Sequence, residues 1–144
     1  MNKSLQVSKN IEINAPAGEV WDALINPEKI KIYLYGTQAT SDWQVGSPIS
    51  FEGEYQGQTY KDKGNVLENT PNKCLKYNYW SGFSGLEDLP ENYCIVTYGI
   101  DSLPNGGVLF SWTQDGFPSE EGQQHSENGL PALLEQIKKL VEGE

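Results

Sequence analysis

Histidine and cysteine, which enzymes commonly use as bases and nucleophiles, are few in this chain. Its single histidine, His125, lies in a polar stretch, and its two cysteines, Cys74 and Cys94, are far from it in the sequence. Nucleophilic catalysis needs a Ser, Cys or Thr held within hydrogen-bond reach of a base. We expect His125 to have a structural role near the start of a helix, with a ligand contact or general-base role as the alternative, and we assign no catalytic residue.

Metal and cofactor sites are not indicated by the spacing of the polar residues. The two cysteines form no CxxC pair, and one histidine gives no zinc triad. Glu52 and Glu54 alternate with Phe51 and Tyr55, which places both carboxylates on the solvated face of a strand. The acidic segment 85–91 matches no calcium-binding loop, and no glycine-rich stretch has the order of a nucleotide-binding loop. We expect reduced, half-buried cysteines, no metal and no cofactor.

Composition and charge limit the class of partner. Across 144 residues, 20 Asp and Glu outweigh 10 Lys and Arg, which gives a net charge of −10. Such a surface repels nucleic acid and anionic lipid, so we expect no nucleic acid partner and no stable membrane association. The 4 Trp, 8 Tyr and 4 Phe residues indicate a folded chain. Its length fits a single domain, 1–144, and without an apolar run near the N-terminus we expect a cytoplasmic protein.

Alternating apolar residues predict most of the sheet. In the first segment, Leu5, Val7, Ile11 and Ile13 share one parity, which is typical of a strand with one buried face. The turn 103–107 is rich in residues that tolerate positive φ, so it should join two strands of a hairpin. The predicted strands cover about 5–13, 49–55, 59–69, 75–80, 92–103 and 107–115.

Helical spacing appears at two places in the sequence. Pro16 suits the first turn of a short helix that runs to Ile25, and a second short helix follows from Glu28 to about Leu34. A long amphipathic helix at the C-terminus has an apolar stripe between Leu130 and Val141. The proline at position 131 leaves two possible starts, near residue 129 or, with a kink, from residue 120.

The order of these elements predicts an α+β helix-grip fold. A strand, two short helices, a meander of about six strands and one long helix would form a curved antiparallel sheet of about six to seven strands wrapped on the C-terminal helix. Because the helix cannot fill the whole concave side, a cavity for an apolar ligand should remain. Residues at inward positions should line it: Trp21, Tyr33, Phe51, Tyr55, Tyr77, Tyr79, Tyr98, Phe110, Trp112, Leu130 and Leu134. Trp21 should serve mainly as a packing anchor.

Four stretches in order resemble one known family. They are 15–30 (APAGEVWDALINPEKI), 41–53 (SDWQVGSPISFEG), 64–80 (GNVLENTPNKCLKYNYW) and 128–142 (NGLPALLEQIKKLVE). Together they resemble the SRPBCC superfamily, in the branch similar to the C-terminal domain of the heat-shock protein 90 ATPase activator. The resemblance spans nearly the whole chain. It implies a helix-grip fold, related to START-like lipid-transfer domains, polyketide cyclases and birch-pollen-allergen-like proteins, with an internal hydrophobic cavity.

The resemblance also frames the expected function. The family commonly has Gly-Trp in the last helix, whereas this chain has Gly129 and Leu130, which implies a roomier or differently shaped pocket. We predict a binding protein for a hydrophobic small molecule or lipid. Two alternatives remain: a module that interacts with a chaperone, as the branch resemblance suggests, and a polyketide cyclase-like enzyme in which His125, Tyr or Asp side chains polarise a bound substrate.

Overall fold

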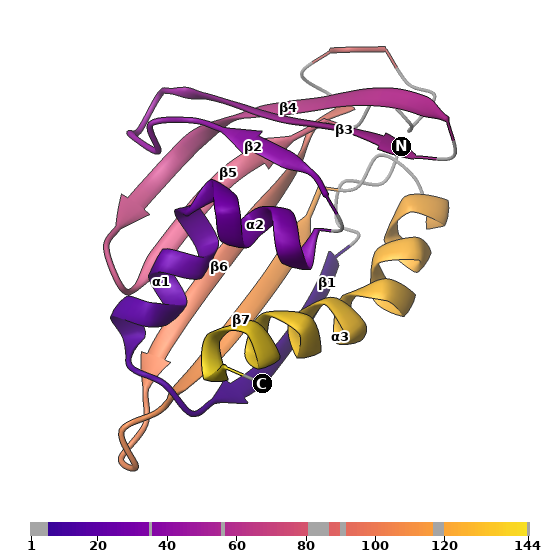
Figure 1. Cartoon of the computed structure of the whole chain (residues 1–144). Coiled ribbons are helices and arrows are strands. Elements are labelled where there is room, and N and C mark those ends of the chain that lie inside the picture. Colours follow the sequence, from indigo (N-terminus) through magenta and orange to yellow (C-terminus); the bar gives the residue numbers. More distant parts are fainter. Residues whose placement is uncertain are drawn as a thin grey trace.

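A curved antiparallel sheet wraps around one long helix in the computed structural model of the chain (Figure 1). The structure describes residues 6–34, 36–55, 57–80, 87–89, 92–116 and 120–143. The side chains of Tyr55, Gln58, Tyr60, Glu121 and His125 lie outside that description. The predicted helix-grip fold of the α+β class is confirmed.

The elements follow the predicted order. The helices are α1 (Ala17–Ile25), α2 (Pro27–Tyr33) and α3 (Glu120–Glu142). The strands are β1 (Gln6–Ile13), β2 (Gln38–Thr40), β3 (Pro48–Tyr55), β4 (Gln58–Thr70), β5 (Cys74–Tyr79), β6 (Cys94–Ser102) and β7 (Val108–Asp115). Strand β2 lies outside the ranges that alternation predicted, because three residues are too few to show a period.

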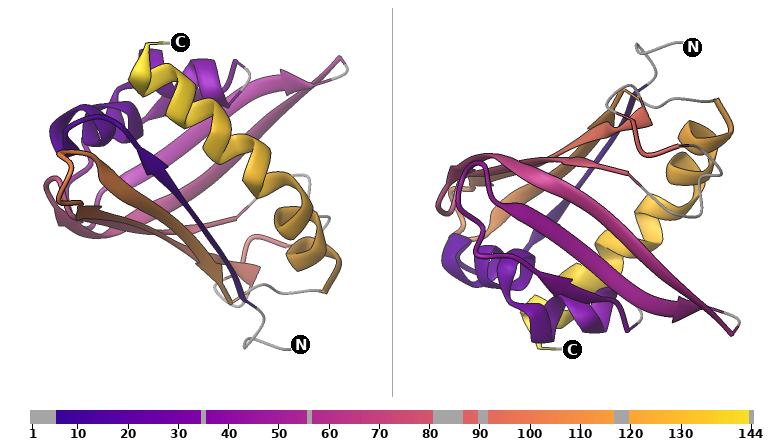
Figure 2. Two further views of the ribbon diagram at one scale, coloured as in Figure 1. Left: turned by 90° about the horizontal axis from the view of Figure 1, so that it is seen from below. Right: turned by 90° about the horizontal axis from the view of Figure 1, so that it is seen from above.

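The described strands form one sheet in the order β1-β7-β6-β5-β4-β3-β2. The meander β2 to β7 pairs each strand with the next, and β1 closes the far side against β7. Between Val66 and Glu68 the register of β4 against β5 shifts. Such a bulge bends a strand and increases its twist, which helps the sheet to curl around α3 (Figure 2).

Proline and asparagine set the limits of the two short helices. Pro16 is the N-cap residue of α1, and the backbone N–H of Asn26 closes the last turn on the carbonyl of Asp22 at 2.8 Å. Asn26 then caps α2, because its Oδ1 accepts from the backbone N–H of Glu28 at 3.0 Å. Asn26 thus ends one helix and begins the next.

Helix α3 begins at Glu120 and continues through Pro131, so the earlier of the two possible starts is correct. Its first turns lack an apolar stripe and are held against β1 by polar contacts. Lys9 forms an ion pair with Glu127 at 2.9 Å, and Gln123 Nε2 donates to the carbonyl of Gln6 at 3.2 Å. The helix therefore runs along the whole length of the strand.

The same helix protects the outer edge of β1. Lys138 Nζ donates to the carbonyl of Glu12 at 2.9 Å, and Glu142 Oε2 accepts from the backbone N–H of Asn14 at 2.7 Å. These contacts occupy groups that would otherwise remain open for pairing with another strand. The opposite edge, β2, is only three residues long, so it offers little backbone for such pairing.

Candidate functional site

Aromatic side chains from four strands form a layer on the concave face of the sheet. The ring centroids are 6.0 Å apart for Phe51 and Tyr77, and 5.6 Å apart for Tyr77 and Tyr98. Tyr98 also contacts Phe110 at 5.8 Å and Trp112 at 4.6 Å. These five residues, here called the aromatic layer, are all buried. They meet because each occupies an inward position of its strand.

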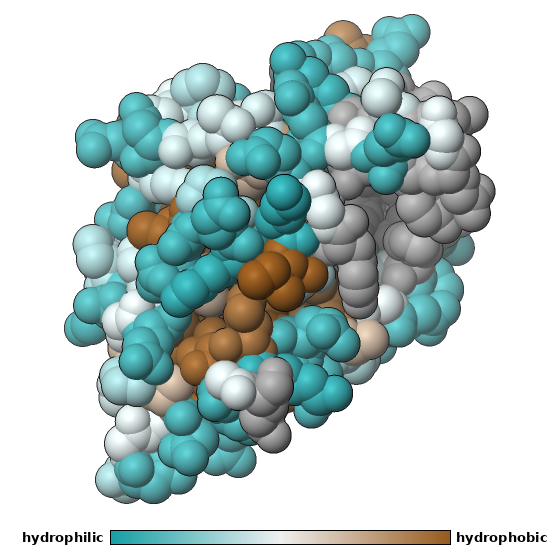
Figure 3. Space-filling view, viewed as in Figure 1, coloured by the Kyte–Doolittle hydropathy of each residue, from teal (hydrophilic) through white to brown (hydrophobic). Residues whose placement is uncertain are grey.

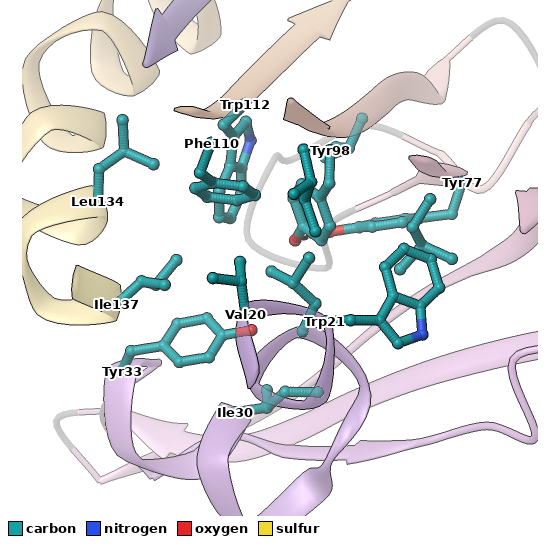
Figure 4. Packing of buried hydrophobic residues seen from close by; sticks show 14 of the residues in the cluster. Val20, Trp21, Ile30, Tyr33, Tyr77, Tyr98, Phe110, Trp112, Leu134 and Ile137 are labelled. Atoms are coloured by element: carbon teal, nitrogen blue, oxygen red, sulfur yellow. Dashed lines mark hydrogen bonds between the residues drawn. The ribbon is translucent and has the colours of Figure 1, made fainter. Parts of the chain in front are cut away.

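The aromatic layer contains two hydroxyl groups that bond to each other. Tyr77 Oη and Tyr98 Oη lie 2.7 Å apart, and either can be the donor. Across the core, Tyr33 of α2 extends toward the same region (Figure 4). Burial raises the pKa of all three phenols well above the ordinary value, and the charges the phenols would carry add to the rise. They remain neutral hydrogen-bonding groups near neutral pH.

Trp112 contributes a donor without an acceptor. Its side chain is 7% exposed, and Nε1 is one of two buried polar side-chain atoms without a hydrogen-bond partner among the described residues. Figure 4 shows the indole nitrogen on the side of the ring system that faces Tyr98. An aromatic ring is a weak acceptor compared with oxygen. An unpaired buried donor costs about 1–3 kcal/mol, so this N–H can gain from any acceptor placed against it.

Polarity changes along the concave face. Toward the start of β1 the inward positions hold Asp62, which is 6% exposed and accepts from the Tyr79 hydroxyl at 2.5 Å. Cys94 lies at the same end and accepts from Gln114 Nε2 at 3.0 Å. The other end is aliphatic, with the buried residues Ile13, Ile49, Val66, Leu75, Ile100 and Val108. Alternation of apolar residues does not reveal this polar end, although Asp62 shares the parity of buried Val66.

Three helices cover this face. Val20, Trp21 and Leu24 of α1 are buried, as are Ile30 and Tyr33 of α2. From α3, the buried residues are Leu130, Leu134 and Ile137. Figure 4 shows these groups of side chains meeting the aromatic layer from the opposite side. Trp21 is 8% exposed, which confirms it as a packing anchor of the core.

Nearly all of the predicted pocket residues belong to one core. Of the eleven, nine are buried members of a single hydrophobic cluster, and half-buried Tyr79 packs against that cluster. The side chain of Tyr55, the remaining one, is outside the described residues. Their assembly follows from alternation in the strands and from the apolar stripe of α3. Whether they border a cavity stays a prediction.

Trp43 belongs to the same core but was missed. It lies in the loop before β3 with a φ of 62°, a conformation unusual for a bulky residue. Its carbonyl accepts from Asn69 Nδ2 at 2.6 Å, while Oδ1 of that asparagine is the second buried atom without a partner among the described residues. Loop residues have no periodicity, so alternation could not find this tryptophan.

Two hollows open beside α1, away from the aromatic layer. One, of about 270 Å³, is bordered by Gly18, Glu19, Asp22, Lys29, Leu140 and Val141. The other, of about 470 Å³, is bordered by Ala17, Asn72, Lys73, Ile100, Asp101 and Ser102. Their linings mix charged and polar residues with a few apolar ones, and apolar surface gathers between α2 and the C-terminal half of α3 (Figure 3). These hollows are poor matches for the predicted apolar pocket.

Most of the other acidic residues that the structure describes face solvent. Glu52 and Glu54 are exposed, as predicted, and so are Glu87 and Asp88. Hydrogen bonds from Lys63 and the hydroxyl of Tyr93 hold the pKa of Asp88 below its usual value. No group of three or more His, Cys, Asp or Glu side chains suited to a metal ion occurs in the part of the chain that the structure describes.

The cysteines add no activated nucleophile. Neither cysteine forms a disulfide; Cys74 is half-buried as predicted, but Cys94 is buried. Burial raises the pKa of the Cys74 thiol, and a hydrogen bond with Glu68 adds to the effect. This favours the less nucleophilic thiol form. His125 lies within α3, and its side chain is outside the described residues.

Comparison with known proteins identifies the family. Residues 14–142 match the sequence profile described as "Activator of Hsp90 ATPase homolog 1-like protein". The chain belongs to this family. This AHSA1-like family assignment agrees with the SRPBCC resemblance of the four sequence stretches. No curated protein matches the chain.

Solved structures support the assignment. ChR145 from Cytophaga hutchinsonii is 42% identical, with a TM-score of 0.83 over 99% of this chain and 97% of that one. The Aha1 dimer from Colwellia psychrerythraea is 15% identical, with a TM-score of 0.74 over 94% and 95% of the two chains. DynU16, a putative protein in the dynemicin biosynthetic locus, is 13% identical, with a TM-score of 0.77 over 96% of this AHSA1-like chain and 48% of that one. The last two likenesses concern the fold alone.

Residues that the structure describes include no helix long and apolar enough to cross a membrane.

Proposed function

We propose that this AHSA1-like protein binds a hydrophobic small molecule or lipid between the concave face of its sheet and its three helices. The main observation in support is the aromatic layer, whose five buried side chains include the hydroxyl pair of Tyr77 and Tyr98. Ligand sites are typically apolar with a few placed polar groups. The aromatic layer has this composition: its own Trp112 provides an indole N–H, and Tyr33 of α2 provides a further hydroxyl group nearby.

The helices supply the movable side of the proposed site. Tyr33 of α2 and Leu130 of α3 are buried against the sheet, although they come from separate elements. A ligand that enters would displace helix side chains from the aromatic layer and would replace their apolar contacts with its own. The sheet therefore determines which chemical groups of a ligand are recognised, and the helices determine how much space the ligand has.

Screening with three kinds of apolar compound tests the proposal. Purified protein would be titrated by NMR with palmitate, cholesterol and naringenin, which represent fatty acids, sterols and flavonoid-like aromatics. We expect saturable shifts from at least one compound at the methyl groups of Leu134 and Ile137. Shifts confined to residues around the two surface hollows, or no saturable binding by any of the three, would refute the proposed function.

A pair of tryptophan substitutions on α3 provides the matched control. Leu130→Trp adds a large ring on the buried side of the helix, where family members commonly have tryptophan, so it should weaken binding at least tenfold. Glu135→Trp adds the same ring on the exposed side and should leave affinity unchanged. Equal affinities for the two variants would show that the ligand does not reach this face of the helix.

The family description supports chaperone interaction as a second candidate function. We infer that such an activity would act through the outer surface and would not depend on the aromatic layer. ATPase assays with purified heat-shock protein 90 test it directly. Stimulation that survives Leu130→Trp would support this second function, whereas no stimulation at equimolar or excess protein would remove it.

A further inference from the structure

The unpaired indole N–H of Trp112 provides a point of recognition inside the proposed site. It is a donor only, so its partner must be an acceptor. Trp112 is more than nine-tenths buried, and among the described residues Nε1 has no partner. Its nitrogen faces the ring of Tyr98 (Figure 4), and that ring lies 4.6 Å away between centroids. A ligand atom that enters at this ring pair would meet the donor directly.

The charges around Trp112 bear on the kind of acceptor. Lys9 of β1 lies directly opposite Trp112 in the sheet register, but its ammonium group is already paired with Glu127 at 2.9 Å. Asp62 lies buried farther along the same face and contributes acceptor oxygens. Burying an unpaired anionic group is far more costly than burying a neutral carbonyl. These surroundings favour a neutral acceptor over a carboxylate.

We propose that the ligand is an apolar molecule with a neutral carbonyl oxygen, and that Trp112 Nε1 donates to this oxygen. This inference rests on the proposed function. The carbonyl lies toward the polar end of the concave face, beside the hydroxyl pair. The apolar body extends toward the aliphatic end, where Val66, Leu75 and Ile100 are buried. One group of the ligand is thus recognised by a hydrogen bond, and the rest by shape and hydrophobic contact.

Three naphthalene probes separate these contributions. 2-Acetylnaphthalene carries a neutral carbonyl, 2-isopropylnaphthalene has a similar shape without an acceptor, and 2-naphthoate carries an anion. Equilibrium dialysis against the purified full chain gives the three dissociation constants. We expect 2-acetylnaphthalene to bind about tenfold more tightly than 2-isopropylnaphthalene, which corresponds to one hydrogen bond of ordinary net strength. 2-Naphthoate should bind more weakly than the ketone.

Substituting the indole identifies the donor. Trp112→Phe keeps an aromatic ring and removes the N–H, so the tenfold preference for the ketone should fall to twofold or less. The ratio of the affinities for 2-acetylnaphthalene and 2-isopropylnaphthalene is informative even if the smaller ring weakens the binding of both probes. Trp43→Phe makes the same change at a buried tryptophan that is not among the predicted lining residues, and there the preference should stay near tenfold.

The outcomes distinguish this inference from the proposed function. If both neutral probes bind equally, or if Trp112→Phe retains the ketone preference, Trp112 does not recognise the ligand although the hydrophobic site stands. Tighter binding of 2-naphthoate than of the ketone would overturn the neutral class of acceptor. If 2-isopropylnaphthalene and the ketone both fail to bind, and palmitate, cholesterol and naringenin fail as well, the proposed function fails together with the inference.

Discussion

Removing the two hydroxyl groups at the centre of the aromatic layer, singly and together, is expected to give strongly non-additive losses of stability. Tyr77 and Tyr98 are each 4% exposed, and their hydroxyl oxygens lie 2.7 Å apart. Tyr77→Phe deprives the Tyr98 hydroxyl of its partner, and Tyr98→Phe does the same in reverse. A buried polar group that loses its partner costs about 1–3 kcal/mol, so we expect each single variant to lose about 2 kcal/mol.

The double variant removes both polar groups and therefore should lose about as much as one single variant. The coupling energy from the double-mutant cycle is then about 2 kcal/mol. Urea unfolding followed by circular dichroism gives the four free energies of unfolding, and unchanged m-values confirm that compactness is preserved. Tyr93→Phe, which removes a hydroxyl that donates to exposed Asp88, controls for the chemical change itself. Losses that simply add in the double variant would refute the reasoning.

Three further substitutions and a pH titration test the packing of the protein and the ionisation of its core. Trp21→Ala should lower the free energy of unfolding by about 3–5 kcal/mol, as expected for truncation of a large buried side chain; a loss below about 1 kcal/mol in urea unfolding would contradict its role. Gly129→Ala should stabilise α3 by about 0.5–1 kcal/mol, because the added Cβ has no heavy atom within 4 Å apart from its chain neighbours and the adjacent helix backbone. In the same assay Gly64→Ala should destabilise the protein by about 3 kcal/mol, because its Cβ would lie 1.8 Å from the backbone oxygen of Asn78. If Gly64→Ala were more stable than Gly129→Ala, this explanation would be wrong. The contribution of the buried phenols to stability should be constant below about pH 9 and fall above pH 10, where the unfolded chain releases phenolic protons while the folded chain retains them. Three buried phenols give a slope of up to about 4 kcal/mol per pH unit, and Tyr98→Phe should reduce it; an equal slope in that variant would show that Tyr98 does not contribute.

Alternation in the sequence was sufficient to predict most of the aromatic layer. In a strand, successive side chains point to opposite faces, so Tyr77, Tyr98 and Trp112 could be placed inward before their partners in the sheet were known. Parity does not say whether inward side chains leave a space between them. That depends on how the helices sit on the sheet, which no local pattern contains.

Two residues show where alternation fails. Counting by twos from Val66 places Glu68 inward, but the bulge shifts the register and Asn69 lies opposite Leu75 instead. The buried Oδ1 of Asn69 was for this reason not anticipated. The start of α3 was left open because its first turns contain no apolar stripe; their position depends on contacts with β1 that are more than 100 residues away in the sequence.

The tryptophan indole region of the ¹H–¹⁵N NMR spectrum tests the central claim most directly. The protein has four indole N–H groups, and Trp112→Phe assigns the resonance of interest by removing it. Titration with 2-acetylnaphthalene should move the Trp112 resonance saturably, while that of Trp80, which donates to the carbonyl of Glu87 at 3.1 Å, should stay in place. A Trp112 resonance that remains fixed at saturating probe would contradict recognition of the ligand by Trp112 on the concave face.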